Sequence, residues 1–311
     1  MLLRLRDLLL CLWLLPMTWM SAFAAPAVVI VSSERSPAYV EAAEALVSEL
    51  QRSGLSRYDM LQLTAAEWSA AGPLTPKLVV ALGTVAADVL AKSELRTSVL
   101  CTLLPRSSFE RILLSHGRRS SAQFSALYLD QPLSRQLDLI RLALPDVHRV
   151  GVLLGPESQV KVPALVALAP FRGFQMVAAN VDRADMLFPA LKRTLEDSDV
   201  LLAIPDPLVY NSSSIQNILL ASFRAKVPLV TFSPAYVRAG SLLALHTTPT
   251  QIGVHAGTLS WGVVQDKALP SSPVYPRDFT VSVNEHVARS LGLSLDAAAL
   301  REQLLRKEGA P

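Results

Sequence analysis

The stretch that decides the fold reads VLLAIPDP at residues 200–207 and VPLVTFSP at residues 227–234, with a helical pattern between the two runs. Each run is short, continuous and apolar, as is typical of a strand buried in a parallel sheet, and each ends in a polar residue, Asp206 or Ser233. The carboxyl ends of parallel strands meet at one edge of a sheet, where helix N-termini present unpaired N–H groups. We therefore expect the polar residues that follow these strands to line a ligand site.

The same alternation of strand and helix patterns extends outward over most of the chain. The expected strands are 27–31, 78–82, 97–103, 149–154, 174–178, 200–204, 227–232 and 279–283. Helical spacing of apolar residues lies between them, for example over 38–50 and 85–92. Short apolar strands that alternate with helices predict an α/β fold with parallel sheets covered on both faces. The length of 311 residues favours two such units.

Residues 1–24 have the composition of a cleaved signal peptide. Arg4 and Arg6 precede an apolar run over 8–15, Pro16 ends the run, and Ala22-Phe23-Ala24 places small residues where a signal peptidase reads them. The apolar run is far shorter than the ~20 residues that a membrane-spanning helix needs. We therefore expect an exported, periplasmic protein.

Composition and motifs argue against several classes of function. The net charge is only +3 and no long basic run is present, so the electrostatic footprint of a nucleic-acid binder is missing. Cys101, the single cysteine outside residues 1–24, lies in an apolar run and is expected to be a buried hydrophobe. The five histidines lack metal-ligand spacing, and no nucleophile or phosphate-binding motif is found. We expect no catalytic residue, no metal and no cofactor, and hence a binding protein.

Four segments, taken together, resemble a known family. They are 78–92 with its Gly83-Thr84 turn, 136–154, 199–257, and 279–293. Their order and spacing are similar to those of the ABC importer substrate-binding proteins that include receptors for tryptophan and tyrosine. That family has the type I periplasmic-binding-protein fold.

The resemblance implies two doubly wound parallel-sheet lobes joined by a three-strand hinge, with the ligand in the cleft between the lobes. The N-terminal lobe would comprise residues 25–122 plus 247–273, and the C-terminal lobe residues 123–246 plus 274–311. It also implies capture of a small polar ligand, with an amino acid considered first, and delivery to an ABC permease in the inner membrane by a monomer. The alternative is a periplasmic sensing subunit of the same fold that signals to a membrane partner without transport.

The expected ligand-binding residues follow strand ends in both lobes. They are Ser32, Ser33, Gly83, Thr84 and Thr102 in the first lobe, and Asp206, Ser233 and Tyr236 in the second. Hydroxyls and N–H groups near the Gly83-Thr84 turn suit a carboxylate, and Asp206 suits an ammonium group. Three alternatives stay open: Thr84 only caps its helix, Asp206 only forms an Asp-Pro turn, and Tyr236 only packs at the hinge.

Two departures from the family pattern fall near the expected cleft. Leu103-Leu104-Pro105-Arg106-Ser107 stands where other members commonly carry Asp-Pro, and the crossover usually rich in glycine and asparagine is 120–125 here. Arg106 either faces an anionic ligand or is a surface residue, and Glu157 either faces the cleft or is a solvated loop carboxylate. These departures leave the identity of the ligand open.

Overall fold

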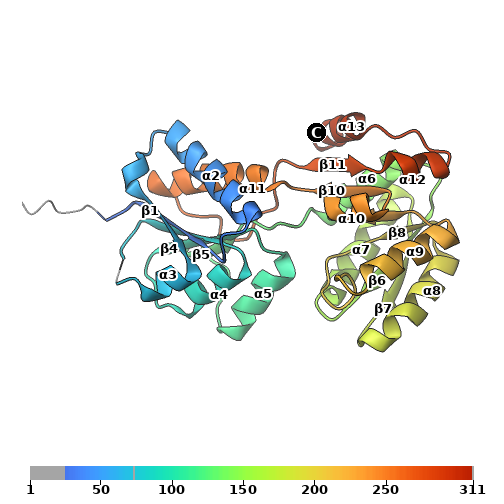
Figure 1. Cartoon of the computed structure of the whole chain (residues 1–311), viewed down its shortest axis with the longest axis horizontal. Helices are drawn as coiled ribbons and strands as arrows, with labels where there is room; N and C mark the ends of the chain where they lie inside the picture. The colour runs from blue at the N-terminus through green and yellow to red at the C-terminus, as the bar shows by residue number, and fades with distance from the viewer. Residues whose placement is uncertain (1–24, 73, 310–311) are drawn as a thin grey trace, which may run out of the picture.

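The computed structural model describes residues 25–72 and 74–309, and the expected signal peptide at 1–24 lies outside them. Within these residues, no helix is both long and apolar enough to cross a bilayer. The chain forms two lobes, each built on its own sheet (Figure 1).

The first lobe contains a five-stranded parallel sheet in the order β2-β1-β3-β4-β5. Its strands are β1 (Val28–Ser32), β2 (Met60–Thr64), β3 (Leu78–Leu82), β4 (Ser98–Thr102) and β5 (Phe124–Ala126). Its helices are α2 (Pro37–Arg52), α3 (Ala65–Ala70), α4 (Thr84–Lys92), α5 (Arg106–Ser115) and α11 (Pro249–Val264). Helices α2 and α11 cover one face of the sheet, and α3, α4 and α5 cover the other (Figure 1).

The second lobe contains a six-stranded sheet in the order β11-β10-β9-β8-β6-β7, in which only β11 pairs antiparallel. Its strands are β6 (Arg149–Leu154), β7 (Gln175–Asn180), β8 (Val200–Leu202), β9 (Leu229–Thr231), β10 (Leu243–His246) and β11 (Thr280–Val283). Its helices are α6 (Leu133–Ala143), α7 (Val162–Leu168), α8 (Leu187–Asp197), α9 (Ile215–Ala225), α10 (Pro234–Ala239), α12 (Glu285–Ser290) and α13 (Ala297–Gly309). The expected fold class, two doubly wound lobes of the type I periplasmic-binding-protein kind, is confirmed.

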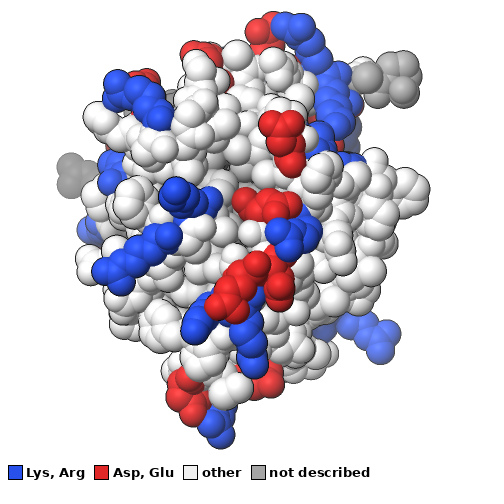
Figure 2. All heavy atoms as spheres, turned by 90° about the vertical axis from the view of Figure 1, so that its right-hand side faces the viewer, with Lys and Arg blue, Asp and Glu red and all other residues white. Residues whose placement is uncertain are grey.

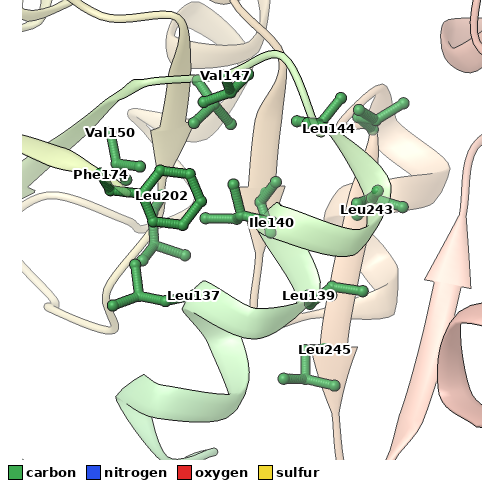
Figure 3. Packing of buried hydrophobic residues seen from close by; sticks show 14 of the residues in the cluster. Leu137, Leu139, Ile140, Leu144, Val147, Val150, Phe174, Leu202, Leu243 and Leu245 are labelled. Atoms are coloured by element: carbon green, nitrogen blue, oxygen red, sulfur yellow. The ribbon is translucent and has the colours of Figure 1, made fainter. Parts of the chain in front are cut away.

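The core of the second lobe shows why the apolar runs became buried strands. On one face of the sheet, Leu137 and Ile140 of α6 pack against Leu202 of β8 and Leu243 of β10 (Figure 3). Helices α8 and α9 bury a second apolar cluster on the opposite face. Because both faces are covered, the inner strands are apolar at successive positions, which is the pattern read from the sequence.

The chain passes between the lobes three times, after β5, after β10 and before β11. β5 pairs with β4, so the chain stays in the first sheet to Ala126, beyond the change of lobe expected at residue 122. After β10 the chain returns to place α11 against α2. There Gly253 and Gly257 allow close approach, because a Cβ on either would overlap Ala42 or Glu49.

Candidate ligand site between the lobes

The ends of three strands gather the expected residues of the first lobe at one edge of the sheet. In the parallel register Ser32 is level with Leu82, and Leu82 is level with Thr102. Ser33, Gly83 and Thr84 follow these strand ends directly. The structure therefore brings all five expected residues of the first lobe to the same edge.

The turn at Gly83 connects the end of β3 to the N-terminus of α4. Gly83 has a φ of 90°, and its N–H donates to the carbonyl oxygen of Thr102 over 2.8 Å. A Cβ on Gly83 would crowd the hydroxyl groups of Tyr39 and Ser33, so this position requires glycine. Sequence reasoning missed Tyr39, because a tyrosine on an amphipathic helix gives no signal of its place over this turn.

Ser33, and not Thr84, caps α4. The Ser33 hydroxyl accepts a hydrogen bond from Ala86 N over 3.1 Å and donates to the Leu82 carbonyl over 2.9 Å. The backbone N–H groups of Thr84 and Val85 have no acceptor among the described residues. These two N–H groups lie at the positive end of the helix dipole, where they can donate to an anion.

Thr102 supports this turn from inside the lobe. Its side chain is fully buried, and its hydroxyl has no partner among the residues that the structure describes. Its carbonyl holds Gly83 in place.

Asp206 links two loops of the second lobe through hydrogen bonds. The residue is 3% exposed, and its carboxylate accepts hydrogen bonds from Ser158 N, the Ser158 hydroxyl and Leu208 N over 2.9–3.0 Å. The bond from Leu208 closes the Asp-Pro turn that the sequence left open as an alternative. Asp206 thereby joins the loop after β8 to the loop after β6.

Ser233 and Tyr236 lie beside an aromatic group after β9. The Ser233 hydroxyl accepts from Ala235 N and so caps α10. The Tyr236 ring lies edge-on to Phe232 with centroids 5.5 Å apart, and Phe232 lies edge-on to Tyr210 at 6.1 Å. Burial raises the pKa of both tyrosines, and the Tyr210 hydroxyl has no partner in the described part of the chain.

A pocket of about 110 Å³ joins the two lobes at the hinge. It is lined by Pro105, Leu129, Asp130, Gln131, Gln136, Pro205, Phe232 and Leu245. Residues of the first lobe, the first crossing segment and the second lobe therefore meet around one cavity. The sequence did not single out Asp130, Gln131 or Gln136, because a short polar stretch between β5 and α6 looks like an ordinary connection.

Larger grooves are each lined by residues of one lobe alone, and one of them is lined in part by Ser32 and Tyr39. One of about 460 Å³ lies between α9 and α12, and another of about 550 Å³ lies between α2 and β2. Each is confined to a single lobe, so the smaller interlobe pocket better fits a ligand that both lobes hold. On the outer face of the second lobe, acidic and basic side chains are interspersed and much of the surface is uncharged (Figure 2).

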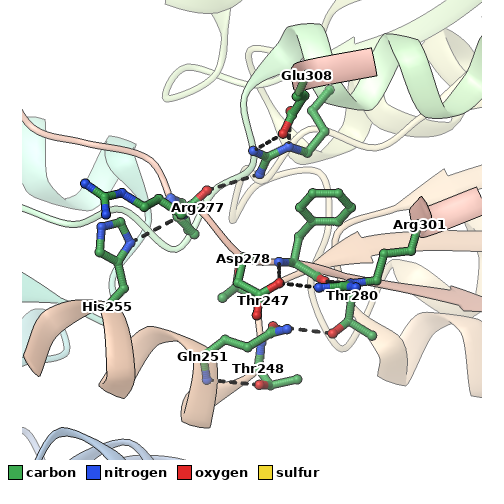
Figure 4. Close-up of polar contacts among 12 residues, drawn as sticks. Thr247, Thr248, Gln251, His255, Arg277, Asp278, Thr280, Arg301 and Glu308 are labelled. Carbon is green, nitrogen blue, oxygen red and sulfur yellow. Dashed lines mark hydrogen bonds and ion pairs between the residues drawn. The ribbon is translucent and has the colours of Figure 1, made fainter. Parts of the chain in front are cut away.

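Hydrogen bonds tie the three crossing segments together (Figure 4). Thr247 accepts from the Gln131 amide over 2.5 Å and donates to the Asp278 carbonyl over 3.4 Å. Arg135 donates to Gln131 Oε1 and the Pro276 carbonyl, and it also pairs with Glu308 of α13. Arg135 is only 6% exposed, so this network is a buried part of the hinge.

Arg106 and Glu157 are both engaged by protein groups. Arg106 pairs with Glu110 over 2.7 Å and donates to the Tyr275 hydroxyl over 3.2 Å. Glu157, in the loop after β6, pairs with Arg111 of α5 in the first lobe. Glu157 therefore faces the other lobe.

Comparison with known proteins agrees with this architecture. The sequence profile of the ABC transporter substrate binding protein family matches residues 73–304, so the chain belongs to that family. A tyrosine-binding protein of Clostridioides difficile (strain R20291) is 22% identical over 165 residues. That match covers 52% of this chain and 47% of the relative, about half the length of each.

Two solved structures share the fold. A ligand-free, open structure of a substrate binding protein with adhesive properties from Clostridium difficile has a TM-score of 0.68 at 18% identity, over 87% of this chain and 96% of that one. A domain from Streptococcus pneumonia in complex with L-Trp has a TM-score of 0.59 at 16% identity, over 88% of this chain and 98% of that one.

Proposed function

We propose that this protein is the exported solute-binding component of an ABC importer, which captures a small polar ligand between its lobes and presents it to a membrane permease. Membership of the substrate-binding family supports the proposal. The observation that carries it is the pocket at the hinge, whose lining comes from both lobes. A solute held there contacts both lobes and so favours their approach, which a permease can recognise.

The ligand we propose is an amino acid. Its carboxylate would be received by the free N–H groups of Thr84 and Val85 at the N-terminus of α4, which lie outside the lining of the hinge pocket and would meet a ligand that extends beyond it. Its side chain would lie against Phe232 and Pro205. The tyrosine and tryptophan named for the relatives are the first ligands to test.

We assign the ammonium contact to Asp130, which lines the pocket. One of its oxygens accepts from Lys161 Nζ and the other from Arg106 N. A carboxylate has about four lone-pair positions, so Asp130 retains capacity for a further donor. The carboxylate of Asp206 already accepts three hydrogen bonds from the protein. Asp206 would therefore affect ligand binding by fixing the positions of the loops after β6 and β8.

The test is a thermal-shift screen, followed by calorimetry, on protein unfolded and refolded to remove any retained ligand. L-Tyrosine and L-tryptophan are compared with 3-(4-hydroxyphenyl)propionate, which lacks the ammonium group, and with tyramine, which lacks the carboxylate. A ligand at ~100 times its Kd stabilises by ~2.7 kcal/mol, which raises the midpoint by a few degrees. Binding of an amino acid but of neither analogue supports the proposal, and no shift with any amino acid contradicts it.

A further inference from the structure

Helix α5 of the first lobe meets the segment that follows β6 of the second lobe. In Figure 1, α5 lies at the edge of the first lobe nearest the second. Two ionic contacts reach this segment from the rest of the chain: Arg111 of α5 pairs with Glu157, and Asp130 of the first crossing segment pairs with Lys161. Asp130 also accepts from the N–H of Arg106 at the start of α5, whereas Arg111 is further along that helix, so a rotation of one lobe against the other affects the two contacts differently.

The first contact is at the pivot. Asp130 belongs to the first crossing segment, between β5 and α6. Its Oδ1 lies 3.0 Å from Nζ of Lys161, just before α7, and its Oδ2 accepts from the N–H of Arg106, the first residue of α5, over 2.6 Å. One carboxylate thus binds groups from both lobes.

Burial makes this contact difficult to break. The Lys161 and Asp130 side chains are 9% and 4% exposed. Separating them would leave the buried ammonium group of Lys161 without its carboxylate and Asp130 with only the N–H of Arg106, which strongly disfavours separation. We therefore expect Asp130 and Lys161 to stay together while the lobes move.

The second contact lies further from the pivot. Arg111 is five residues beyond Arg106 on α5, which corresponds to ~7.5 Å along the helix. The Arg111 and Glu157 side chains are 53% and 24% exposed, so their attraction is weaker and is screened by salt. Rotation about Asp130 separates Arg111 from Glu157 first.

We propose that these two contacts form an interlobe latch: Asp130 and Lys161 fix the pivot, and Arg111 with Glu157 limits the angle between the lobes before solute binds. Arg111, Glu157 and Lys161 are positioning residues, since they act on solute through the geometry of the cleft. The latch rests on the proposed function only in that the lobes move about this hinge.

The experiment measures the distance between lobes without any solute. Spin labels are placed on Gln51→Cys of α2 and Arg193→Cys of α8, in a chain that begins at Ala25, where the remaining cysteine, Cys101, is fully buried. Glu157→Arg places like charges opposite each other and should at least double the width of the distance distribution. The double variant that combines Arg111→Glu with Glu157→Arg exchanges the two charges and should restore the original width of the distribution.

Two controls separate the latch from general charge effects. Arg183→Glu breaks an exposed ion pair with Asp185 inside the second lobe and should leave the distribution unchanged. Sodium chloride at 1 M reduces the screening length to ~3 Å. It should therefore broaden the interlobe distance distribution of the protein that retains Arg111 and Glu157, but not that of the Arg111→Ala variant.

An unchanged distribution in Glu157→Arg, or a swap that stays as broad as Glu157→Arg alone, overturns the latch.

For the pivot, Asp130→Asn combined with Lys161→Met removes both charges and leaves no buried ion unpaired. It should shift the mean distance even in protein whose circular dichroism is native. Because the distances are measured without solute, a failed solute screen does not alter them. Normal L-tyrosine binding with an unchanged distribution in Glu157→Arg refutes the latch alone.

Discussion

Gly155 packs directly against the carboxylate of Asp206, and a Cβ on Gly155 would overlap all three atoms of that group. Asp206 is held on its other side by Ser158 and Leu208, so it cannot move away without losing hydrogen bonds. The loops after β6 and β8 are therefore built around one buried carboxylate.

Gly155→Ala should lower the stability of the protein. The added methyl group must displace a buried carboxylate, and such overpacking costs about 1–3 kcal/mol. Thermal unfolding measures the effect. Gly262→Ala is the matched control, because a Cβ there meets only the Lys267 side chain at 3.9 Å, and removing a helix-interior glycine should stabilise by ~0.5–1 kcal/mol. Equal midpoints for the two variants would contradict this packing.

Asp206→Asn should reduce both stability and solute binding. The amide nitrogen of asparagine would face donors in place of an acceptor, which costs about 1–3 kcal/mol. Ser158→Ala removes a partner of the same carboxylate, so the two substitutions should be non-additive in urea unfolding. Loss of solute binding at an unchanged unfolding midpoint would instead make Asp206 the direct ammonium partner expected from the sequence.

The thiol of Cys101 should be inert in the folded protein. Burial raises its pKa well above the ordinary value, and the residue has no exposed surface, so thiolate is scarce and reagents cannot reach it. A chain beginning at Ala25 should react with Ellman's reagent in urea and not in buffer. Prompt reaction of the native protein would show that β4 opens locally.

His255 should make the protein less stable as the pH falls from 6.5 to 4. Burial, aided by the charge of Arg277, lowers the pKa of His255 from 6.5 to about 4. Between these values the unfolded chain binds more protons than the folded one, so the free energy of unfolding rises with pH and this contribution is fully present above 6.5.

Urea unfolding from pH 4 to 7 checks this, with His255→Gln expected to have the shallower pH dependence. Glutamine retains an acceptor for the Arg277 N–H, which reaches His255 Nδ1 over 3.4 Å. His148→Gln, at an exposed position, should leave the slope unchanged. Equal slopes for His255→Gln and the unmodified protein would refute the assignment.

The sequence predicted most strands of both sheets, including the edge strands β7 and β11, and missed three, β2, β5 and the inner strand β10. The apolar runs near 78–82 and 149–154 became β3 and β6, because burial on both faces leaves no polar position in such strands. Strand β2 went unrecognised because it is not a continuous apolar run: Gln62 is exposed, and Leu61 and Leu63 are only partly buried. Strand β5 has three residues, too few for any periodicity.

For the candidate site, the sequence predicted where residues lie better than it predicted their contacts. The parallel topology brings Ser33 and Gly83 together at one edge of the sheet, as their positions after strand ends predicted, and their contact with a ligand stays a prediction. Nothing local indicates that Ser33 caps a helix 53 positions later in the chain, or that Asp206 is occupied by Ser158. Such partnerships depend on long-range contacts, which one sequence does not reveal.

The return of α11 to the first lobe has a consequence for how the chain acquires its structure. The α2 face of the first sheet is covered by a helix that begins at Pro249, nearly two hundred residues after the end of α2. Contacts of such separation carry a large loop-closure entropy and slow folding. During synthesis, the apolar face of α2 therefore stays uncovered until α11 has been made, and the N-terminal lobe completes its core only after most of the second lobe has been synthesised.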